Sequence, residues 1–291
     1  MKVLKYAIDK ALTDGDLVIY KQPIVRLSPK DTDSLVRHYE VLTLVQGELS
    51  TTYELDNIEV LVAELEAFGA TRHLDVAVTK QVLRWLTLCN ERISALEKEA
   101  NATSLNQAIE EIGVERLFHI NIHPDSINFD SDVLLAKINK ALSDGNIKHE
   151  SLCFEITENT LLQNPEAVGK MLEQLRASGC KIALDDFGKK MLNLATLRIL
   201  RPDFVKIDGD YVKRSLTSEF DRVVIKSLVE LSKIVGAETI AEKIEDVDIY
   251  YLMRALGVDY GQGWYFSRGY LLEDAVSSDI FRADSRLIKE E

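Results

Sequence analysis

The chain has 291 residues, of which 46% are hydrophobic, and its formal net charge at pH 7 is −13. A chain of this length can bury a large core within a single domain. The acidic balance argues against a nucleic-acid polymer as ligand, because such a surface needs a basic stripe to neutralise phosphates. Apolar runs stay well below about 18 residues and no charged-then-apolar leader follows Met1, so we expect no membrane span and a cytoplasmic location.

Eight short apolar segments, rich in β-branched and aromatic residues, have the length and composition of β-strands. In chain order these predicted strands are 17–25, 38–45, 117–122, 152–157, 181–186, 204–208, 238–244 and 260–266. Helical patterns lie between most of them, at 57–68, 79–88, 167–179 and 219–236. The last two helices end in Gly179 and Gly236, which fit the left-handed residue that closes a helix.

This alternation of strands and helices predicts an α/β protein, and eight such strands predict a (β/α)8 barrel of the TIM type. An open, doubly wound sheet is the alternative, although no glycine-rich dinucleotide loop follows any strand. We expect one domain over residues 1–291, with a core at about 16–271, a polar insertion with its own helix at about 90–116, and a charged terminal segment at 273–291. Free, partly buried thiols are predicted for the cysteines, which form no CxxC pair: Cys89, Cys153 and Cys180.

Polar side chains occur at or near the end of almost every predicted strand. In a (β/α)8 barrel these ends face the mouth in which loops build the active site. A lone acid in a strand usually faces solvent, but that interpretation weakens for a set with a polar group on nearly every strand. Several carboxylates in one mouth need divalent cations, and oxygen donors favour Mg²⁺ or Mn²⁺ over Zn²⁺. The residues are Glu40, Asn121, Glu155, Asp185, Asp186, Lys206, Asp208, Glu242, Glu245 and Gln262.

Seven short motifs follow one another along these strands. They are "YEVL" (39–42), "INIH" (120–123), "FEITE" (154–158), "LDDFG" (184–188), "VKID" (205–208), "IAEKIE" (240–245) and "GQGWYF" (261–266). In order and spacing the series resembles the EAL-domain family of cyclic di-GMP phosphodiesterases, from about Asp16 to Leu271. The resemblance implies a modified (β/α)8 barrel with one reversed strand. It also implies two Mg²⁺ or Mn²⁺ ions that activate water to open cyclic di-GMP into linear pGpG.

The same resemblance implies a role for each residue of the motifs. Lys206 and Gln262 would lie near the attacking water, and Lys206 would assist as a charged partner of water or phosphate. Glu158 would brace the loop after Asp186, and Glu245 would be a supporting carboxylate. Glu242 would act in catalysis and also hold metal. The implied metal ligands are Glu40, Asn121, Glu155, Asp185, Asp186 and Glu242.

The sequence departs from the family pattern at several positions. Leu44 stands where the family usually has an Arg that grips a substrate phosphate, so a charge-assisted contact worth about 1.5–3 kcal/mol is missing. The segment "KKMLN" (189–193) replaces the usual loop that, by resemblance, links metal binding to dimerisation. Lys243 stands where a glycine is usual. Substrate grip, regulation and a homodimer are therefore the open parts of the resemblance.

Three hypotheses about function follow from these residues. The first is a metal-dependent cyclic di-GMP phosphodiesterase, with weakened activity. The second is a catalytically degenerate receptor for cyclic di-GMP or for a protein partner, which Leu44 and the altered loop favour. The third takes Lys206 as a Schiff-base lysine of an aldolase-like barrel. The neighbouring acids count against the third, because carboxylates raise the pKa of a lysine that such chemistry needs lowered.

Overall fold

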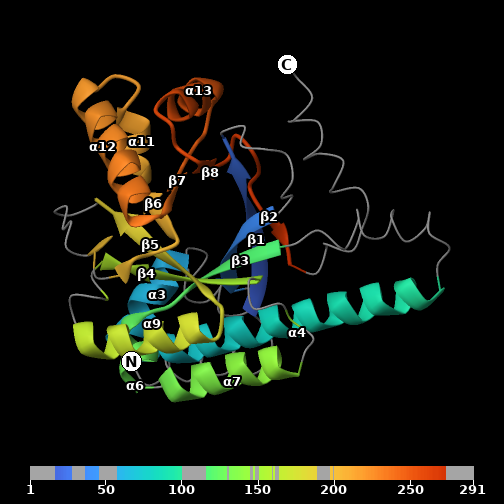
Figure 1. Ribbon diagram of the computed structural model, residues 1–291. Helices are drawn as coiled ribbons and strands as arrows, with labels where there is room; N and C mark the ends of the chain where they lie inside the picture. Colours follow the sequence, from blue (N-terminus) through green and yellow to red (C-terminus); the bar gives the residue numbers. More distant parts are fainter. Residues whose placement is uncertain are drawn as a thin grey trace.

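The computed structural model describes residues 17–27, 37–45, 58–99, 116–129, 131–144, 147, 151–158, 160, 164–188, 197–198 and 200–272. The described strands are β1 (Leu17–Arg26), β2 (Arg37–Val45), β3 (Arg116–Asn121), β4 (Leu152–Thr157), β5 (Lys181–Phe187), β6 (Phe204–Ile207), β7 (Glu238–Ala241), β8 (Tyr260–Gly261) and β9 (Tyr270–Leu271). The described helices are α3 (Ile58–Ala67), α4 (Thr71–Glu99), α6 (Pro124–Phe129), α7 (Ser131–Ser143), α9 (Pro165–Ala177), α11 (Gly209–Arg214), α12 (Glu219–Val235) and α13 (Val247–Ala255). Figure 1 shows the strands at the centre, with helices outside them.

Strands β1 to β8 form a closed barrel. The order β2-β3-β4-β5-β6-β7-β8-β1 returns to its start because β1 also pairs with β2. Strands β2 to β8 are parallel, whereas β1 is antiparallel to both of its barrel neighbours. A parallel crossover needs about a dozen residues or more and usually a helix, so the short link at 27–36 favours a hairpin instead. The chain therefore has the predicted modified (β/α)8 barrel, with β1 as the reversed strand.

Three predicted elements differ from the observed ones, and one of them is the strand expected at 238–244, which ends at Ala241. The strand expected at 260–266 ends at Gly261, and residues 264–266 form a turn. The helix expected at 79–88 is the middle of α4, which continues to Glu99. The first part of the expected insertion at 90–116 thus prolongs this helix instead of forming one of its own, while residues 100–115 lie outside the described residues.

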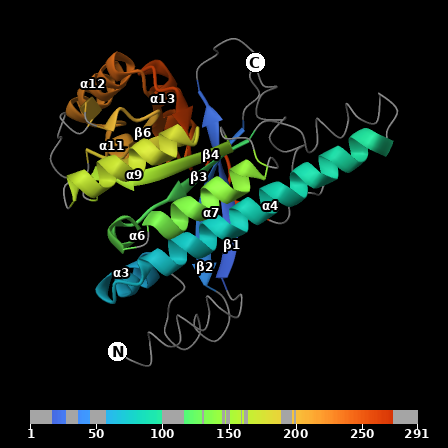
Figure 2. The same ribbon diagram turned by 60° about the horizontal axis from the view of Figure 1, so that its bottom comes forward.

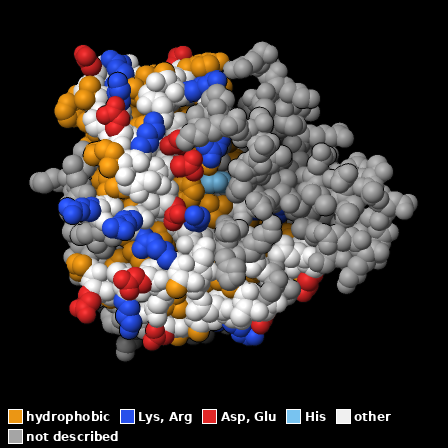
Figure 3. Space-filling view, viewed as in Figure 1, with side chains coloured by type: hydrophobic (Ala, Val, Ile, Leu, Met, Phe, Trp, Pro, Cys, Tyr) orange, Lys and Arg blue, Asp and Glu red, His pale blue; other side chains and the backbone are white. Residues whose placement is uncertain are grey.

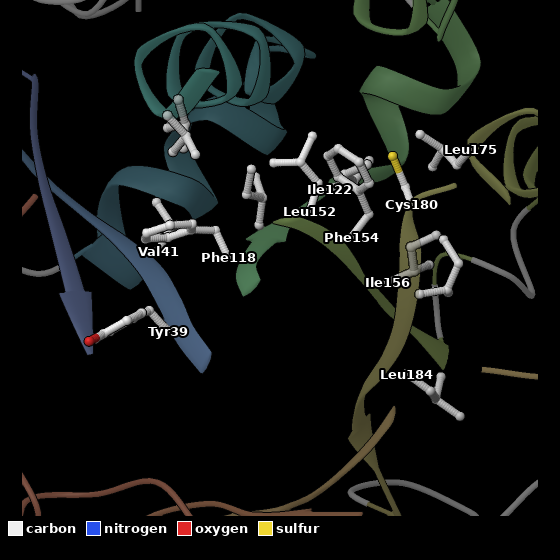
Figure 4. Packing of buried hydrophobic residues seen from close by; sticks show 14 of the residues in the cluster. Tyr39, Val41, Phe118, Ile122, Leu152, Phe154, Ile156, Leu175, Cys180 and Leu184 are labelled. Carbon is white, nitrogen blue, oxygen red and sulfur yellow. The ribbon is translucent and has the colours of Figure 1, made fainter. Parts of the chain in front are cut away.

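Alternation along the strands separates an outer core from the barrel interior. Successive strand residues point to opposite faces of a sheet. One set, which includes Phe118, Phe154 and Leu184, packs in the large buried core with residues of the surrounding helices (Figure 4). The alternate positions form a separate small layer inside the barrel, made of Ile24, Leu117, Cys153, Ala183, Phe204, Ile240 and Tyr260.

The helices cover the barrel in two groups. Figure 2 shows α4, α7 and α9 close together, with α11, α12 and α13 on another side. Helix α12 is capped by Ser218, whose side chain accepts a hydrogen bond from Asp221 N. It ends before Gly236, whose φ of 82° is the left-handed conformation expected for this glycine. Its buried face, with Ile225 and Leu228, covers strands β6 and β7.

The cysteines and the helix lengths bear on two further expectations. All three cysteines, Cys89, Cys153 and Cys180, are free and buried. Within the described part of the chain, every helix is too short or too polar to traverse a lipid bilayer.

Candidate metal-binding and catalytic site

The upper end of the barrel is the end at which the parallel strands terminate. There the interior is built around the ammonium group of Lys206 on β6. Its Nζ atom lies 2.7 Å from Glu155 Oε2 and 3.0 Å from Glu242 Oε1. It also lies 3.2 Å from Asp185 Oδ1 and 3.3 Å from Glu40 Oε1. These carboxylates come from β4, from the residue after β7, from β5 and from β2. Four carboxylates, each on a different strand or directly after one, therefore surround the Lys206 side chain, which is only 1% exposed.

Burial and charge act against each other in this cluster. Burial lowers the pKa of Lys206, but Asp185, Glu155 and the other two carboxylates outweigh it and raise that pKa well above its usual value. Burial raises the pKa of Glu242 to about 8, although the nearby Lys206 charge opposes the shift. Burial likewise raises the pKa of Glu155 well above its usual value. Lys206 is therefore a fixed positive charge, yet it does not by itself stabilise all the ionised carboxylates.

A group of three acids lies at the rim of this cluster. Carboxylate oxygens of Asp185, Asp186 and Glu242 lie within 4.8 Å of one another, and all three side chains are half-buried. In a regular strand, Asp185 and Asp186 would point to opposite faces. Asp186 instead has φ 54°, and the pairing of β5 with β6 shifts between Leu184 and Phe187. This irregularity brings two adjacent carboxylates to one place.

Amide side chains connect the cluster to β1 and to the segment after β8. Asn121 Nδ2 donates to Glu40 Oε1 at 3.2 Å, and Gln262 Nε2 donates to Glu40 Oε2 at 2.5 Å. Gln262 Nε2 also donates to Gln22 Oε1 at 2.8 Å, and Gln22 Nε2 donates to the Ser267 carbonyl at 2.8 Å. Glu40 is thus held by the amides of Asn121 and Gln262, and Gln22 supports Gln262 in turn.

Gly263 explains why Gln262 can reach the interior. Gly263 has φ 155°, and a Cβ added there would lie 2.0 Å from the Ile244 carbonyl oxygen. Because Gly263 has no side chain, the connection after β7 can lie directly against the segment after β8. Ile244 N then donates to the Gln262 carbonyl at 2.9 Å, and Tyr265 N donates to the Ile244 carbonyl at 3.0 Å.

Two residues of the site were missing from the sequence prediction. Gln22 faces Glu40 across the β1–β2 ladder. His119 Nδ1 lies 2.9 Å from Glu155 Oε1, and burial followed by the Lys206 charge lowers the pKa of His119 to about 3, so the imidazole is neutral. His119 precedes Asn121 by two residues, so the alternation along β3 places both side chains on one face and was a usable signal.

The remaining predicted residues lie in several different places. Glu158 is buried just after β4. Glu245 is exposed and pairs with Lys213 Nζ at 2.7 Å, so its ion pair is with α11 and not with Lys206. Asp208 caps α11 by accepting a hydrogen bond from Asp210 N at 2.9 Å. The segment 189–193 lies outside the described residues.

Leu44 and Lys243, which depart from the family pattern, take distinct positions. Leu44 is half-buried on β2, opposite Val18 of β1 and on the same face as Glu40. Lys243 has φ 54°, which is the left-handed region that suits glycine. Its aliphatic stem lies over Gly209, where an added Cβ would come within 2.4 Å of Lys243 Cδ. The absence of a side chain at Gly209 therefore makes room for Lys243.

The donor set fits a hard divalent cation. Lys206 contacts four carboxylates of the cluster, and Asp186 lies beside two of these, so the ionised acids carry more negative charge than one ammonium group offsets. Gln262 Oε1 is buried and accepts no hydrogen bond from any described residue, and Asp185 Oδ1 has the ion pair with Lys206 but no well-directed hydrogen bond from the described residues. Carboxylate and amide oxygens are the ligands that Mg²⁺, Mn²⁺ and Ca²⁺ prefer. The acidic group at Asp185, Asp186 and Glu242 is thus suited to bind metal.

A comparison with known families agrees with this geometry. The chain matches the EAL domain over residues 6–269. It belongs to the EAL domain family. The EAL chain is 29% identical over 264 residues to the cyclic di-GMP phosphodiesterase PdeB of Shewanella oneidensis, a match that covers 90% of this chain and 27% of that relative. It is 28% identical over 267 residues to the cyclic di-GMP phosphodiesterase PdeA of Borreliella burgdorferi, covering 92% and 35%. The chain spans roughly a third of the length of these curated relatives.

Solved EAL structures have the same fold. The EAL enzyme Bd1971, in its form bound to cAMP and cyclic di-GMP, superposes with a TM-score of 0.76 at 21% identity, over 94% of this chain and 67% of that one. The FimX EAL domain of Pseudomonas aeruginosa, bound to cyclic di-GMP, superposes with a TM-score of 0.72 at 19% identity, over 91% and 96%. At these identities the likeness establishes the barrel fold and no more.

Proposed function

We propose that this EAL chain is a metal-dependent phosphodiesterase that hydrolyses cyclic di-GMP to linear pGpG, with weakened activity. The observation that carries the proposal is the group of oxygens from Asp185, Asp186 and Glu242 within 4.8 Å of one another, two of whose members contact the buried Lys206. The names of the relatives, which are cyclic di-GMP phosphodiesterases, support the choice of substrate. We further propose that the protein works in the cytoplasm, where it would encounter cyclic di-GMP.

The proposed cofactor is a pair of Mg²⁺ or Mn²⁺ ions. Bound metal would supply a water of lowered pKa and would offset the negative charge of the phosphodiester. An acidic protein needs such cations to accept an anionic substrate at this mouth. The proposed ligands are Glu40, Asn121, Glu155, Asp185, Asp186 and Glu242.

The chain's own residues would orient these ligands and the attacking water. Lys206 holds carboxylates from four strands in one place and would contribute a fixed positive charge beside the water or phosphate. The unsatisfied Oε1 of Gln262 would accept a hydrogen bond from that water. Glu158 would brace the loop after Asp186, and Glu245 would support the rim from its ion pair with Lys213.

The substrate grip is the part in which this chain is expected to be weak. Leu44 offers no charge to a phosphate, and its half-buried position on the face of Glu40 agrees with a place beside the mouth. We expect the missing contact to raise KM more than it lowers kcat, because an ordinary phosphate contact acts in both ground and transition states. We also propose that the chain forms a homodimer.

Incubation with cyclic di-GMP and Mg²⁺ or Mn²⁺, followed by chromatographic separation of the nucleotides, tests the activity. Metal-dependent formation of pGpG is expected, with loss of product in Glu242→Gln. Glu238→Gln is the matched control, because Glu238 begins the strand that Glu242 follows and pairs with Arg26 at the other end of the barrel. Tight binding of cyclic di-GMP with no product at any metal concentration would reject hydrolysis and establish the receptor instead.

A further inference from the structure

Lys243 has a backbone conformation that a lysine does not favour. Its φ of 54° lies in the left-handed region, where a side chain costs conformational free energy and a glycine does not. On one side of it, Glu242 N donates to the Ile207 carbonyl at 3.2 Å. On the other side, Ile244 N donates to the Gln262 carbonyl at 2.9 Å, so the neighbours fix this conformation. A glycine would fit the same backbone without strain, so the turn itself does not require the lysine.

The contacts of the Lys243 side chain add little to stability. Its ammonium Nζ lies 4.0 Å from Asp210 Oδ1, and the two side chains are 53% and 63% exposed. Exposed ion pairs at such a separation are screened by water and salt and contribute little. Lys213 on α11, by comparison, lies 2.7 Å from Glu245. The ammonium of Lys243 is therefore loosely held, and it can turn toward another anion.

The Lys243 side chain crosses the rim of the barrel beside the acidic group. Lys243 directly follows Glu242, whose carboxylate belongs to that group. The Cβ, Cγ and Cδ atoms of Lys243 lie against Gly209, which stands two residues past the end of β6. The stem therefore runs from the end of β7 to the end of β6, the strand that carries Lys206. Its exposed ammonium lies at the mouth end of both strands.

An anionic ligand at this mouth meets few accessible cations among the described residues. Lys206 is 1% exposed and is surrounded by carboxylates, so its charge is already occupied. Figure 3 shows basic and acidic side chains mixed over the described residues of the face in view, without a broad basic surface. Leu44 on β2 carries no charge, and the strand order places β2 across the ring from β6. Lys243 would thus reach a ligand from the side opposite Leu44.

We propose that Lys243 is the rim cation through which this chain grips a phosphate group of the dinucleotide at the acidic group. The phosphate would accept a hydrogen bond from the ammonium in place of the distant Asp210 carboxylate. Lys243 then acts on affinity and not on the hydrolytic step, because such a contact is present in both ground and transition states. The inference rests on the proposed function, since it takes the ligand to be cyclic di-GMP.

Calorimetric titration with cyclic di-GMP, with Ca²⁺ replacing Mg²⁺ to suppress turnover, measures the contact. Lys243→Met keeps an apolar stem over Gly209 and removes the charge, and it is expected to raise the dissociation constant about tenfold. Lys243→Arg should restore most of the affinity. Lys170→Met is the matched control, because Lys170 is exposed on α9 and its loss changes the net charge equally. In Mg²⁺, Lys243→Met should raise KM and leave kcat nearly unchanged.

Two further variants separate ligand contact from a structural role. Lys243→Gly should melt at the temperature of the parent or above it, since the left-handed backbone suits glycine, and should weaken binding as Lys243→Met does. Asp210→Asn should tighten binding in the parent, because the ammonium loses a competing partner, and should have no effect on binding in Lys243→Met. A structural role predicts instead that Lys243→Met and Asp210→Asn lower the melting temperature and leave affinity unchanged.

The outcomes distinguish this inference from the function on which it rests. Equal affinities of the parent and Lys243→Met for cyclic di-GMP would overturn the inference and leave hydrolysis standing. Binding that weakens as expected, without formation of pGpG in Mg²⁺ or Mn²⁺, would support the inference and reject hydrolysis. No binding of cyclic di-GMP by the parent would overturn both.

Discussion

The lower and upper layers of the barrel interior lie on the same strands but have opposite chemistry. At the lower end, Cys153, Phe204 and Ile240 belong to a small apolar layer. Two residues further along each of these strands or just past it stand Glu155, Lys206 and Glu242. The lower layer needs nothing else to be stable, because its members are apolar and packed. The upper layer concentrates charge in a buried place, which costs stability unless a cation is bound.

The contrast shows that the residues that stabilise the fold and the residues that carry the chemistry lie at different depths of the barrel interior. Alternation keeps both layers inside, while position along the strand decides whether a side chain supports the floor or faces the mouth. His38 packs against the lower layer, and His119 contacts both Phe204 of the lower layer and Glu155 of the upper layer. Their rings are 5.6 Å apart, and His38 stacks on Tyr260 at 4.7 Å. Substitutions in the two layers should therefore have separable effects on folding and on turnover.

The largest effect is expected for Asp185→Asn in the upper layer. Removing a charged ligand should lower hydrolysis of cyclic di-GMP by roughly a thousandfold or more, with the fold retained, because metal supplies several kcal/mol to such reactions. Cys153→Ala in the lower layer is the control. It should lower the melting temperature and leave kcat/KM of the folded protein nearly unchanged. If Asp185→Asn keeps turnover at limiting Mg²⁺, this carboxylate is not a metal ligand. The same comparison applies to Glu155→Gln.

Lys206→Met should shift stability more than any other single change in the upper layer. The substitution leaves carboxylates from four strands without their common cation, and breaking a buried ion pair of this kind costs about 3–5 kcal/mol. Urea unfolding in EDTA measures the loss, and added Mg²⁺ should recover part of it. An unchanged midpoint in EDTA would mean that the carboxylates are neutral in the free protein.

Acid should weaken the fold through His38, which packs against the lower layer. Burial, followed by the charges of His119 and Arg26, lowers the pKa of His38 to about 3 from an ordinary value of 6.5. The neutral form is favoured in the folded state, so this stability is present above pH 6.5 and is lost as pH falls from there toward 3. Between pH 7 and pH 5 the loss from His38 is about 2 kcal/mol.

Unfolding free energies of the parent and of His38→Phe over this pH range measure that loss. The variant should show a shallower pH slope, whatever its stability at neutral pH, and the slope that remains is expected to come in part from His119. Equal slopes in the two proteins would show that His38 does not titrate with unfolding.

The smallest effect is expected for Leu44→Arg at the rim. An added phosphate contact should tighten cyclic di-GMP binding about tenfold, for about 1.4 kcal/mol. Thr43→Arg is the control, because Thr43 is next to it on β2 and points to the opposite face. Affinity and melting temperature should be measured with Ca²⁺ replacing Mg²⁺ to suppress turnover. A stable Leu44→Arg protein with unchanged affinity would place the phosphate elsewhere.

The sequence by itself determined the elements and the chemistry of the mouth. Apolar alternation located β4 at Leu152–Thr157 with its observed bounds, and α12 within one residue. The polar residue at each strand end also indicated the carboxylate cluster in advance. These predictions succeed because strand and helix periods are local properties, and because parallel strands bring their ends to one edge whatever their exact pairing.

Tertiary structure alone decided which of these groups touch. The sequence contains no sign that Lys206 contacts carboxylates from four strands, that Gln22 joins the network, or that Glu245 pairs with Lys213 instead. The early end of β8 at Gly261 likewise depends on the close approach of Ile244. Such contacts join residues far apart in the chain, and they form only when barrel closure fixes the position of each strand, which no local pattern encodes.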